Sequence, residues 1–378
     1  MASALGPHAS ARWRAALAAA VQTNCDIADA RHAGELTLCT YLLQMREFYR
    51  WEQRQALGVT LERQAVGQWI AEREALWATL ETEDFAALPL GPGACADPFD
   101  ADAANAVLQP LGLLYGAGLV GRQRPVFFLA ELHATGEREG LPVLQGGSEL
   151  ARTLLAPPAA LAGGGRGPIV LRRESLARWC WERVEAFALR PVPGTAAHAM
   201  LRCYALELDF HAGLPRWLDD QVETAVLHEL GEYRVGQWLG PAWAALRAAL
   251  PEGRAEIRAR ALRDQLADLG VTLPALLQRG DEGPLHAWFA AYDGAREEWL
   301  PTLPAAYAAW RGGDGEGGDG GRQLRAAITS GHAHLQARAQ ALLALWASEG
   351  EAALGLIVEQ LGASAAPKPR AERALSPS

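Results

Sequence analysis

The chain of 378 residues has a formal net charge of −9, and 50% of its residues are hydrophobic while 21% are charged. Those proportions predict folded globular domains and exclude a largely disordered chain. The acidic excess is spread along the chain, which argues against a nucleic-acid-binding surface. No apolar run reaches the roughly 18 residues that span a bilayer, and the first residues lack the apolar segment of a signal peptide. We therefore expect a cytoplasmic protein with no nucleic-acid and no membrane partner.

The first part of the chain has the periodicity of a helical hairpin or a three-helix unit. Helices are predicted over residues 9–32, 35–57 and 61–81. The pair Ala33-Gly34 would end the first helix, and a loop rich in Gly and Pro follows the third. Apolar residues repeat along one face of the second helix, and Glu52 falls on that same face.

The middle of the chain changes to short β-prone segments. Residues 111–120, 126–133 and 141–144 are apolar or β-prone and are separated by Gly-bearing turns, which predicts a small antiparallel meander. The string from Gly116 to Gly121 spells GxGxxG. A second predicted strand follows it where a dinucleotide-binding fold needs a helix, so we expect a hairpin turn there. Residues 154–168 read as a loop rich in Ala, Gly and Pro.

Helical patterns dominate from residue 173 onward. Helices are predicted over 173–189, 195–211, 215–239, 241–250, 254–269 and 284–310, with Gly or Pro at the breaks. A Gly-rich linker follows over 312–321, and one or two more helices occupy 322–361. The polar, Pro-containing tail 363–378 is expected to be disordered.

These elements predict a mainly α, α+β protein, a multi-helix bundle with a small antiparallel β insertion. The expected domains are an N-terminal helical hairpin or bundle (1–85), a β-containing insertion (100–172), a helical core domain (173–311), C-terminal helices (322–362) and the disordered tail (363–378). Most of the 13 tryptophans lie in predicted helices, where a large core side chain is the ordinary explanation. Some of them could line a ligand pocket between helices.

The clearest chemical signal is the string His228-Glu229-Leu-Gly-Glu232, inside the helix predicted over 215–239. The apolar stripe of this helix includes the position of Glu229, with Glu232 at its edge and His228 just beyond it. A carboxylate on a buried face must be ion-paired, protonated or bound to a metal. His228 and Glu232 are four residues apart, so they can bind one metal ion or pair with each other. Glu232 stands where the zinc-protease pattern HExxH has its second histidine, which weakens a protease assignment.

The end of the first predicted helix offers a second set of candidate ligands. Asp29 and His32 are three residues apart in a dense polar stretch, and Glu52 adds a carboxylate from the next helix. Docked against the His228 helix, they would complete a mixed His/carboxylate shell suited to iron, manganese or zinc. The alternative is that Asp29 and Arg31 are solvated and that His32 merely ends a helix, where the dipole favours basic residues.

A resemblance to a known family rests on two segments of the N-terminal region. They are Asn24-Cys-Asp-Ile-Ala-Asp-Ala-Arg-His-Ala-Gly and Leu38-Cys-Thr-Tyr-Leu-Leu-Gln-Met-Arg-Glu-Phe-Tyr-Arg-Trp-Glu52. Together they resemble the opening of an uncharacterised family of proteobacterial hypothetical proteins. The resemblance implies no activity, cofactor or catalytic residue. It favours a single site built from this stretch and the His228 helix.

The leading hypothesis is a metal-dependent enzyme, a hydrolase or an oxidoreductase, with its site between the N-terminal helices and the His228 helix. Its metal ligands would be His228, Glu232, Asp29 and His32. Its additional ligand or general base would be Glu229 or Glu52. The competing hypothesis, of comparable weight, is a non-catalytic helical scaffold in which these residues form a buried polar network. A third is a binding protein with a tryptophan-lined pocket for an apolar ligand, and the small-molecule or protein partner stays open.

Overall fold

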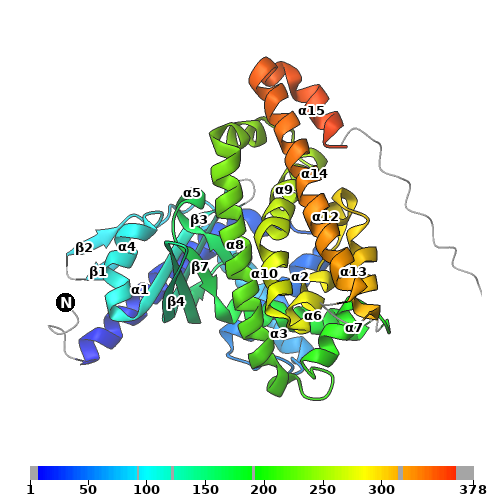
Figure 1. Ribbon diagram of the computed structural model, residues 1–378. Helices are drawn as coiled ribbons and strands as arrows, with labels where there is room; N and C mark the ends of the chain where they lie inside the picture. The colour runs from blue at the N-terminus through cyan, green and yellow to red at the C-terminus, as the bar shows by residue number, and fades with distance from the viewer. Residues whose placement is uncertain (1–6, 92, 121–122, 190–191, 314–317, 363–378) are drawn as a thin grey trace, which may run out of the picture. The chain divides into compact units, whose positions relative to one another are not determined.

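A computed structural model describes residues 7–91, 93–120, 123–189, 192–313 and 318–362 (Figure 1). Over these residues the protein is α+β, as predicted, and its strands form a five-stranded sheet and a two-stranded sheet. The chain divides into two compact units, Met1–Glu229 and Leu230–Ser378. The helical-bundle arrangement and the finer domain division stay predictions. The tail expected to be disordered, 363–378, lies outside the described residues.

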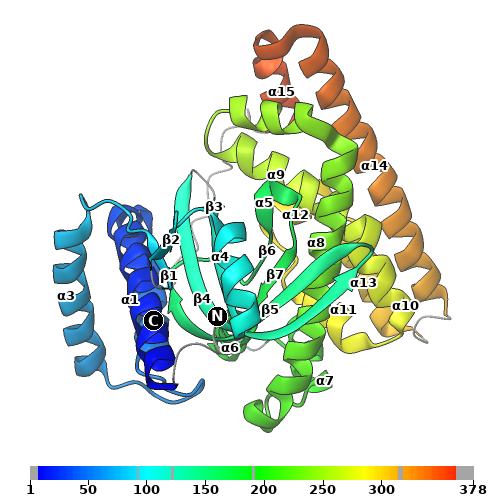
Figure 2. The same cartoon turned by 90° about the vertical axis from the view of Figure 1, so that its left-hand side faces the viewer.

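Three helices open the first unit near their predicted positions. They are α1 (Pro7–His32), α2 (Leu38–Glu52) and α3 (Arg63–Leu80). The side chains of Thr37 and Glu62 begin α2 and α3, because their oxygens accept hydrogen bonds from free backbone N–H groups of the first turn. Figure 2 shows α1 lying between α3 and the strands, and α1 packs against both.

The main sheet is larger than the predicted meander. Its strand order is β3-β4-β5-β7-β6, and all neighbours are antiparallel except the parallel pair β5 and β7. Its strands are β3 (Leu113–Val120), β4 (Arg124–Arg138), β5 (Leu141–Arg152), β6 (Ala159–Leu161) and β7 (Ile169–Arg172). The small sheet pairs β1 (Leu88–Gly91) with β2 (Ala94–Ala96). The predicted antiparallel meander is confirmed for β3, β4 and β5. Strands β6 and β7 were not predicted, and β6 lies in the expected loop 154–168.

The second half of β5 escaped prediction because it lacks the composition of a strand. Gly146 and Gly147 interrupt the apolar pattern, and charged Glu149 and Arg152 then occupy buried positions at 0% and 1% exposure. A Cβ at Gly146 would lie 3.0 Å from the Ala130 Cβ of β4, so the absence of a side chain serves strand packing.

The GxGxxG string behaves as expected. It runs along the end of β3, and β4 follows as the next antiparallel strand, which confirms the strand-to-strand connection and excludes a dinucleotide-binding turn at this place. Residues 121 and 122 of this connection lie outside the described part of the chain.

The core of the first unit lies between α1 and the sheet. Its buried α1 residues recur at helical spacing and pack on β3, β4 and α4 (Ala101–Leu108); they are Leu17, Val21, Cys25 and Ala28. Burying each large apolar side chain stabilises the fold by about 1.5–3 kcal/mol. Asn24 anchors the loop after α3, because it both donates to the carbonyl and accepts from the N–H of Ala86 at 2.8 Å.

Helices α5 (Ala162–Gly165), α6 (Arg173–Leu189), α7 (Ala196–Cys203) and α8 (Phe210–Ala249) follow the sheet. The bounds of α6 are those predicted. The helix predicted over 195–211 is wrong in its second half, because α7 ends at Cys203 and the expected turn at 212–215 lies inside α8. Gly213 reads as a helix end in the sequence, yet it serves packing, since a Cβ there would lie 2.2 Å from the Tyr204 carbonyl oxygen. The break predicted between residues 239 and 241 is confirmed, because Gly240 takes a non-helical φ of 66° and divides α8 into two helical parts.

The second unit consists of helices and the turns between them, with no strand among its described residues. After the last turns of α8 it contains α9 (Arg254–Ala267), α10 (Leu273–Arg279), α11 (Glu282–Ala290), α12 (Gly294–Trp299), α13 (Leu303–Gly312), α14 (Asp319–Glu349) and α15 (Leu354–Gln360). A π-helical turn, Asp268–Thr272, joins α9 to α10. The long helix α14 packs against both α9 and α13.

One stretch of the second unit, Asp319–Gln360, is long and apolar enough to cross a membrane by length and composition. Its most apolar window has a mean hydropathy of 1.5, and 17% of that window is buried. The sequence analysis missed this stretch because Glu349 and Glu351 interrupt it. The stretch is two helices, since α14 ends at Glu349 and Gly350 takes a φ of 57°. Core helices of globular proteins pass the same test, so this is weak support for a membrane span.

An aromatic cluster in the second unit surrounds a buried histidine. His286 on α11 is 4% exposed, its Nδ1 lies 2.7 Å from the Tyr307 hydroxyl, and its ring packs edge-on against Trp310. Burial lowers the pKa of His286 from 6.5 to about 4, and the charge of Arg311 adds to this effect. The imidazole is therefore neutral in the folded protein at pH 7.

Acidification is expected to destabilise the protein through His286. The unfolded chain takes up this proton near pH 6.5 and the folded chain only near pH 4, so the stabilisation is complete above pH 6.5 and is lost as the pH falls through this window. At about 1.4 kcal/mol per pH unit, the loss is on the order of 3 kcal/mol. Denaturant unfolding between pH 7 and pH 4 should show a shallower pH dependence for His286→Gln than for the wild type. An equal pH dependence of the unfolding free energy in the two proteins would contradict the assignment of this destabilisation to His286.

Candidate functional site

Two of the predicted metal ligands, Asp29 and His32, line one small cavity at the end of α1. The cavity has a volume of ≈10 Å³, room for about one water molecule, and Arg124 and Thr153 are among its other lining residues. Asp29 is 7% exposed and accepts a 2.8 Å hydrogen bond from the Leu154 N–H. Burial raises the pKa of Asp29 well above its usual range, and this hydrogen bond offsets only part of that rise. The predicted alternative of a solvated Asp29 is therefore wrong.

His32 is engaged by the turn that follows α1. Its Nδ1 lies 2.8 Å from one carboxylate oxygen of Glu35, and the other oxygen of Glu35 lies 3.0 Å from the Arg124 guanidinium. Arg124 thus places a positive charge on the wall of the cavity that Asp29 and His32 share. A metal cation in this cavity would be repelled by that charge.

Glu52, the predicted ligand or general base, is held in an ion pair. Its two carboxylate oxygens accept hydrogen bonds from the Trp69 indole and from the Arg73 guanidinium. Arg73 also pairs with Asp26 at 2.9 Å, and Asp26 accepts a 3.2 Å hydrogen bond from the Trp77 indole. Burial raises the pKa of Asp26, while Arg73 and Trp77 act against that rise. These side chains tie α1, α2 and α3 together.

The remaining candidates, His228, Glu229 and Glu232, lie on α8. Glu229 is 7% exposed, which confirms that this carboxylate is buried. Glu232 pairs with Arg263 of α9 at 2.5 Å. Taken alone, neither unit contains, among its described residues, three His, Cys, Asp or Glu side chains whose ligand atoms lie within 4.8 Å of one another. The metal-binding and catalytic roles of these residues stay predictions.

A second buried polar network joins the sheet to α6, and the sequence analysis did not identify it. Glu149 accepts hydrogen bonds from the Arg172 guanidinium at 2.8 Å and the Ser175 hydroxyl at 2.7 Å, and the Arg152 guanidinium lies 3.5 Å away. Burial favours the neutral form of Glu149, but Arg172 and Arg152 outweigh burial and hold its pKa below the usual range. Burial and the nearby Arg178 lower the pKa of Arg152 to about 9. Arg152, Arg172 and Arg178 can stay charged in the protein interior only because carboxylates lie beside them.

The same network reaches α2. Glu47 is 1% exposed and accepts hydrogen bonds from Arg46 at 2.8 Å and from Arg50 at 3.0 Å. Arg46 also pairs with Glu185 of α6. The Glu47–Arg50 pair is buried and lies within α2. The Arg46–Glu185 pair joins α2 to α6, and both of its side chains are about 30% exposed, so it contributes less than a buried pair.

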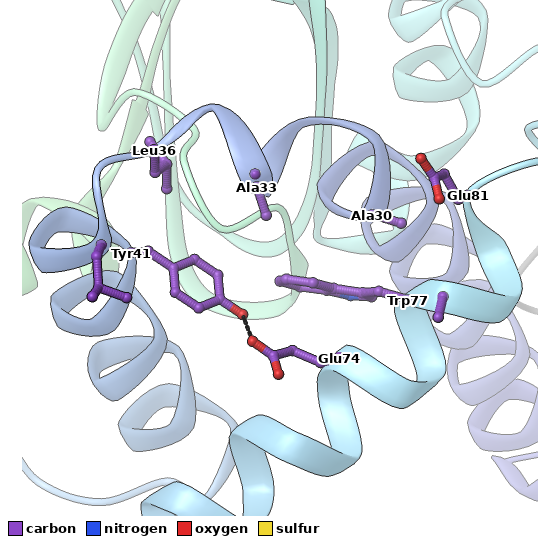
Figure 3. Close-up of a pocket in the computed structure, with 10 residues that line it drawn as sticks. Ala30, Ala33, Leu36, Tyr41, Glu74, Trp77 and Glu81 are labelled. Atoms are coloured by element: carbon purple, nitrogen blue, oxygen red, sulfur yellow. Dashed lines mark hydrogen bonds between the residues drawn. The ribbon is translucent and has the colours of Figure 1, made fainter.

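A pocket of ≈450 Å³ opens beside these networks, at the end of α1 (Figure 3). Small residues leave its space free, because Ala30, Ala33 and Gly34 form the wall that comes from α1 and the turn after it. Leu36 and Leu38 add apolar surface where the chain passes into α2. The mostly apolar wall is typical of a site for a small organic molecule.

The α3 side of the pocket carries aromatic and acidic groups. Glu74, Trp77, Ala78 and Glu81 occur at i, i+3, i+4 and i+7, so they share one face of the helix. Figure 3 shows the Trp77 ring extending toward Tyr41, whose hydroxyl donates a 2.8 Å hydrogen bond to Glu74. Burial and Glu74 raise the pKa of Tyr41, so its hydroxyl stays protonated at neutral pH.

The sequence contains one signal for this pocket, on the face of α3 that carries Trp77. Trp77 was interpreted as a core residue, and its 5% exposure bears out that interpretation. The acidic positions Glu74 and Glu81 flank it on the same helical face, and that combination distinguishes a pocket wall from an ordinary core face. Tyr41 comes from a different helix, so its approach could be found only from the fold.

Comparison with protein families decides the classification of the chain. A model described as the N-terminal domain of a family of unknown function (DUF6866) matches residues 16–172, and the model of the C-terminal domain of that family matches residues 177–364. The chain belongs to the DUF6866 family. No curated protein and no solved structure matches it. The predicted membership of an uncharacterised family is confirmed, and the proteobacterial origin stays a prediction.

The pocket lies within one DUF6866 domain, whereas the Glu149 network extends over both. All residues that line the pocket belong to the stretch matched by the DUF6866 N-terminal domain. The Glu149 network extends further, because Arg172 is the last residue of that match and Arg178 lies in the match of the C-terminal domain. Helix α6 is joined to the sheet of the DUF6866 N-terminal domain by the 2.7 Å hydrogen bond from the Ser175 hydroxyl to Glu149.

Proposed function

We propose that the first unit is a ligand-binding module and that its pocket takes a small organic molecule. The observation that carries this proposal is the pocket itself. Its volume of ≈450 Å³ falls within the range of about 300–1,000 Å³ that small-molecule sites occupy. Its wall combines apolar residues with a few polar groups, among them the Tyr41 hydroxyl and the Glu74 carboxylate.

The shape of the pocket is fixed before any ligand arrives. The Trp77 indole is hydrogen-bonded to Asp26, and Asp26 is held by Arg73, which also pairs with Glu52. Tyr41 is held in the same way by Glu74. A site whose aromatic rings are already oriented loses little conformational entropy on binding. The buried ion pairs thus have a use in a binding protein, and they also support the alternative of a non-catalytic scaffold.

A metal-dependent hydrolase or oxidoreductase remains the second candidate, because Asp29 and His32 line one cavity. The arginine partners of Glu52 and Glu232 weigh against it, since those carboxylates would have to leave their ion pairs to bind a metal. Elemental analysis of the purified protein tests this candidate. Stoichiometric iron, manganese or zinc that is lost in a folded His228→Ala, Glu232→Ala double variant would support the enzyme, and the absence of metal after supplemented growth would exclude it. The cytoplasmic location is likewise a proposal.

Filling the pocket is expected to abolish ligand binding without unfolding the protein. Ala78 lies on the exposed side of α3 and lines the pocket, so Ala78→Leu should occupy the space. The neutral apolar dye N-phenyl-1-naphthylamine should bind the wild type, and its affinity should fall at least tenfold, or about 1.4 kcal/mol, in the variant. Fluorescence titration measures both affinities.

The matched control is Ala75→Leu, an exposed alanine of the same helix that does not line the pocket. This variant should bind the dye as the wild type does. Dye binding that is unaffected by Ala78→Leu, or lost equally in both variants, would place the dye outside this pocket and overturn the proposal.

A further inference from the structure

We propose that this pocket recognises an organic ammonium cation, an inference that rests on the proposed ligand-binding function. Two carboxylates, Glu74 and Glu81, and two aromatic rings, Tyr41 and Trp77, line the same pocket. Aromatic faces attract ammonium groups through the negative charge density of the ring, and carboxylates attract them by charge. The leucine and alanine walls suit the apolar substituents of such a cation.

The two carboxylates have no cationic partner in the part of the chain that the structure describes. Glu74 interacts with the neutral Tyr41 hydroxyl, and no ion pair engages Glu74 or Glu81. Nearby Arg73 is paired with Asp26 and Glu52 and so does not neutralise them. Their negative charge is therefore available to a ligand.

Arg31, the other cation of this region, is also engaged. Its guanidinium donates hydrogen bonds to the carbonyl oxygens of Glu81 and Glu83 and lies 4.9 Å from the centre of the Phe85 ring. Arg31 is not among the residues that line the pocket. These contacts place the positive charge of Arg31 beside the Glu81 backbone, outside the set of residues that line the pocket.

The end of α1 adds to the negative potential. The helix ends at His32, and the pocket wall is built from Ala30 and from Ala33 and Gly34, which follow that end. A helix C-terminus behaves as about half a negative charge, because its last carbonyl groups have no helical partner. Arg31 and His32 in the last turn of α1 offset part of this charge, so the two carboxylates are the main source of the negative potential.

The spacing of Glu74 and Glu81 favours a bulky cation over a metal ion. Seven residues of helix separate them by roughly 10 Å along the axis. Metal ions hold oxygen ligands at about 2–2.6 Å, and among the described residues no further His, Cys, Asp or Glu gathers with these two carboxylates into a metal-type cluster. They can instead stand on either side of an alkylammonium group seated against the Trp77 ring.

A pair of probes that differ only in charge tests the inference. Choline carries a trimethylammonium group, and 3,3-dimethyl-1-butanol has the same shape with a neutral carbon in place of nitrogen. In calorimetric titrations of the full chain we expect choline to bind at least tenfold more tightly than the alcohol. Glu74→Gln and Glu81→Gln should each weaken choline binding several-fold and leave the alcohol unchanged. Added salt should also weaken choline binding, since Glu74 and Glu81 are exposed and their attraction for a cation is screened.

Glu72→Gln is the matched control, because Glu72 lies on the same helix, contacts Gln68 and does not line the pocket. It should leave choline binding unchanged. Equal binding of the two probes overturns the cation inference and leaves the ligand site intact. If neither probe binds, while the naphthylamine dye binds the wild type and loses affinity in Ala78→Leu, the cation inference is likewise overturned and the ligand site stays intact. Failure of all three probes overturns the proposed function as well.

Discussion

Replacing Glu149 with alanine is expected to lower the free energy of unfolding by about 3–5 kcal/mol. The reason is the burial of its partners, since Arg152 and Arg172 are 1% and 2% exposed and both depend on this carboxylate. Without it, two guanidinium groups would stay in the protein interior with less opposing charge. Urea unfolding monitored by circular dichroism measures the change.

Two further variants make this result interpretable. Glu137→Ala changes the same residue type at an exposed position of β4 and should alter stability by less than about 0.5 kcal/mol. Ser175→Ala removes one hydrogen bond to Glu149 but keeps the charges, so it should cost on the order of 1 kcal/mol. If Glu149→Ala is as mild as Glu137→Ala, the buried network does not stabilise the first unit. If Glu149→Ala does not fold, Ser175→Ala still reports on the network.

Replacing Gly231 with alanine is expected to destabilise the second unit by about 1–3 kcal/mol, the cost of overpacking a tight contact. Gly231 is the glycine of the His228-Glu-Leu-Gly-Glu232 string. An added Cβ would lie 2.7 Å from the Ala267 carbonyl oxygen, so α8 and α9 would have to move apart. The neighbouring ion pair between Glu232 and Arg263 would be stretched by the same movement.

Gly236→Ala provides the opposite expectation on the same helix. Gly236 is exposed, and nothing lies within 4 Å of a Cβ added there. Alanine should therefore stabilise the helix by about 0.5–1 kcal/mol through its higher helix propensity. Thermal unfolding of both variants checks the pair, and destabilisation of similar size at the two positions would contradict the close contact at Gly231.

Helices with a clear apolar period and a marked end were predictable from the sequence. The bounds of α6 agree with prediction because Pro191 follows its last turn, and α1 ends at His32 as Ala33-Gly34 indicated. The late part of β5 was not predictable, because Glu149 and Arg152 stand where a strand normally places apolar side chains. A buried charge is recognisable only when its partners are known, and those partners come from β7 and α6.

The residues of the candidate site were also hard to predict, because their partners come from other helices. The sequence placed Glu229 on the buried face of its helix, and it is 7% exposed; the burial of Asp29, also 7% exposed, was not predicted. It did not indicate that Arg73 would pair with Glu52, because nothing in α3 alone reveals which helix it faces. The pocket could not be predicted from the sequence either, because its lining residues come from three separate segments that meet only in the folded protein.

The most direct test of the ligand site is a crystal structure of the full chain grown with choline well above its measured dissociation constant. We expect electron density for the trimethylammonium group against the Trp77 ring, between Glu74 and Glu81. Choline bound elsewhere on the protein, with no density in this pocket, would contradict the claim that the pocket of the DUF6866 N-terminal domain is a binding site for an organic cation.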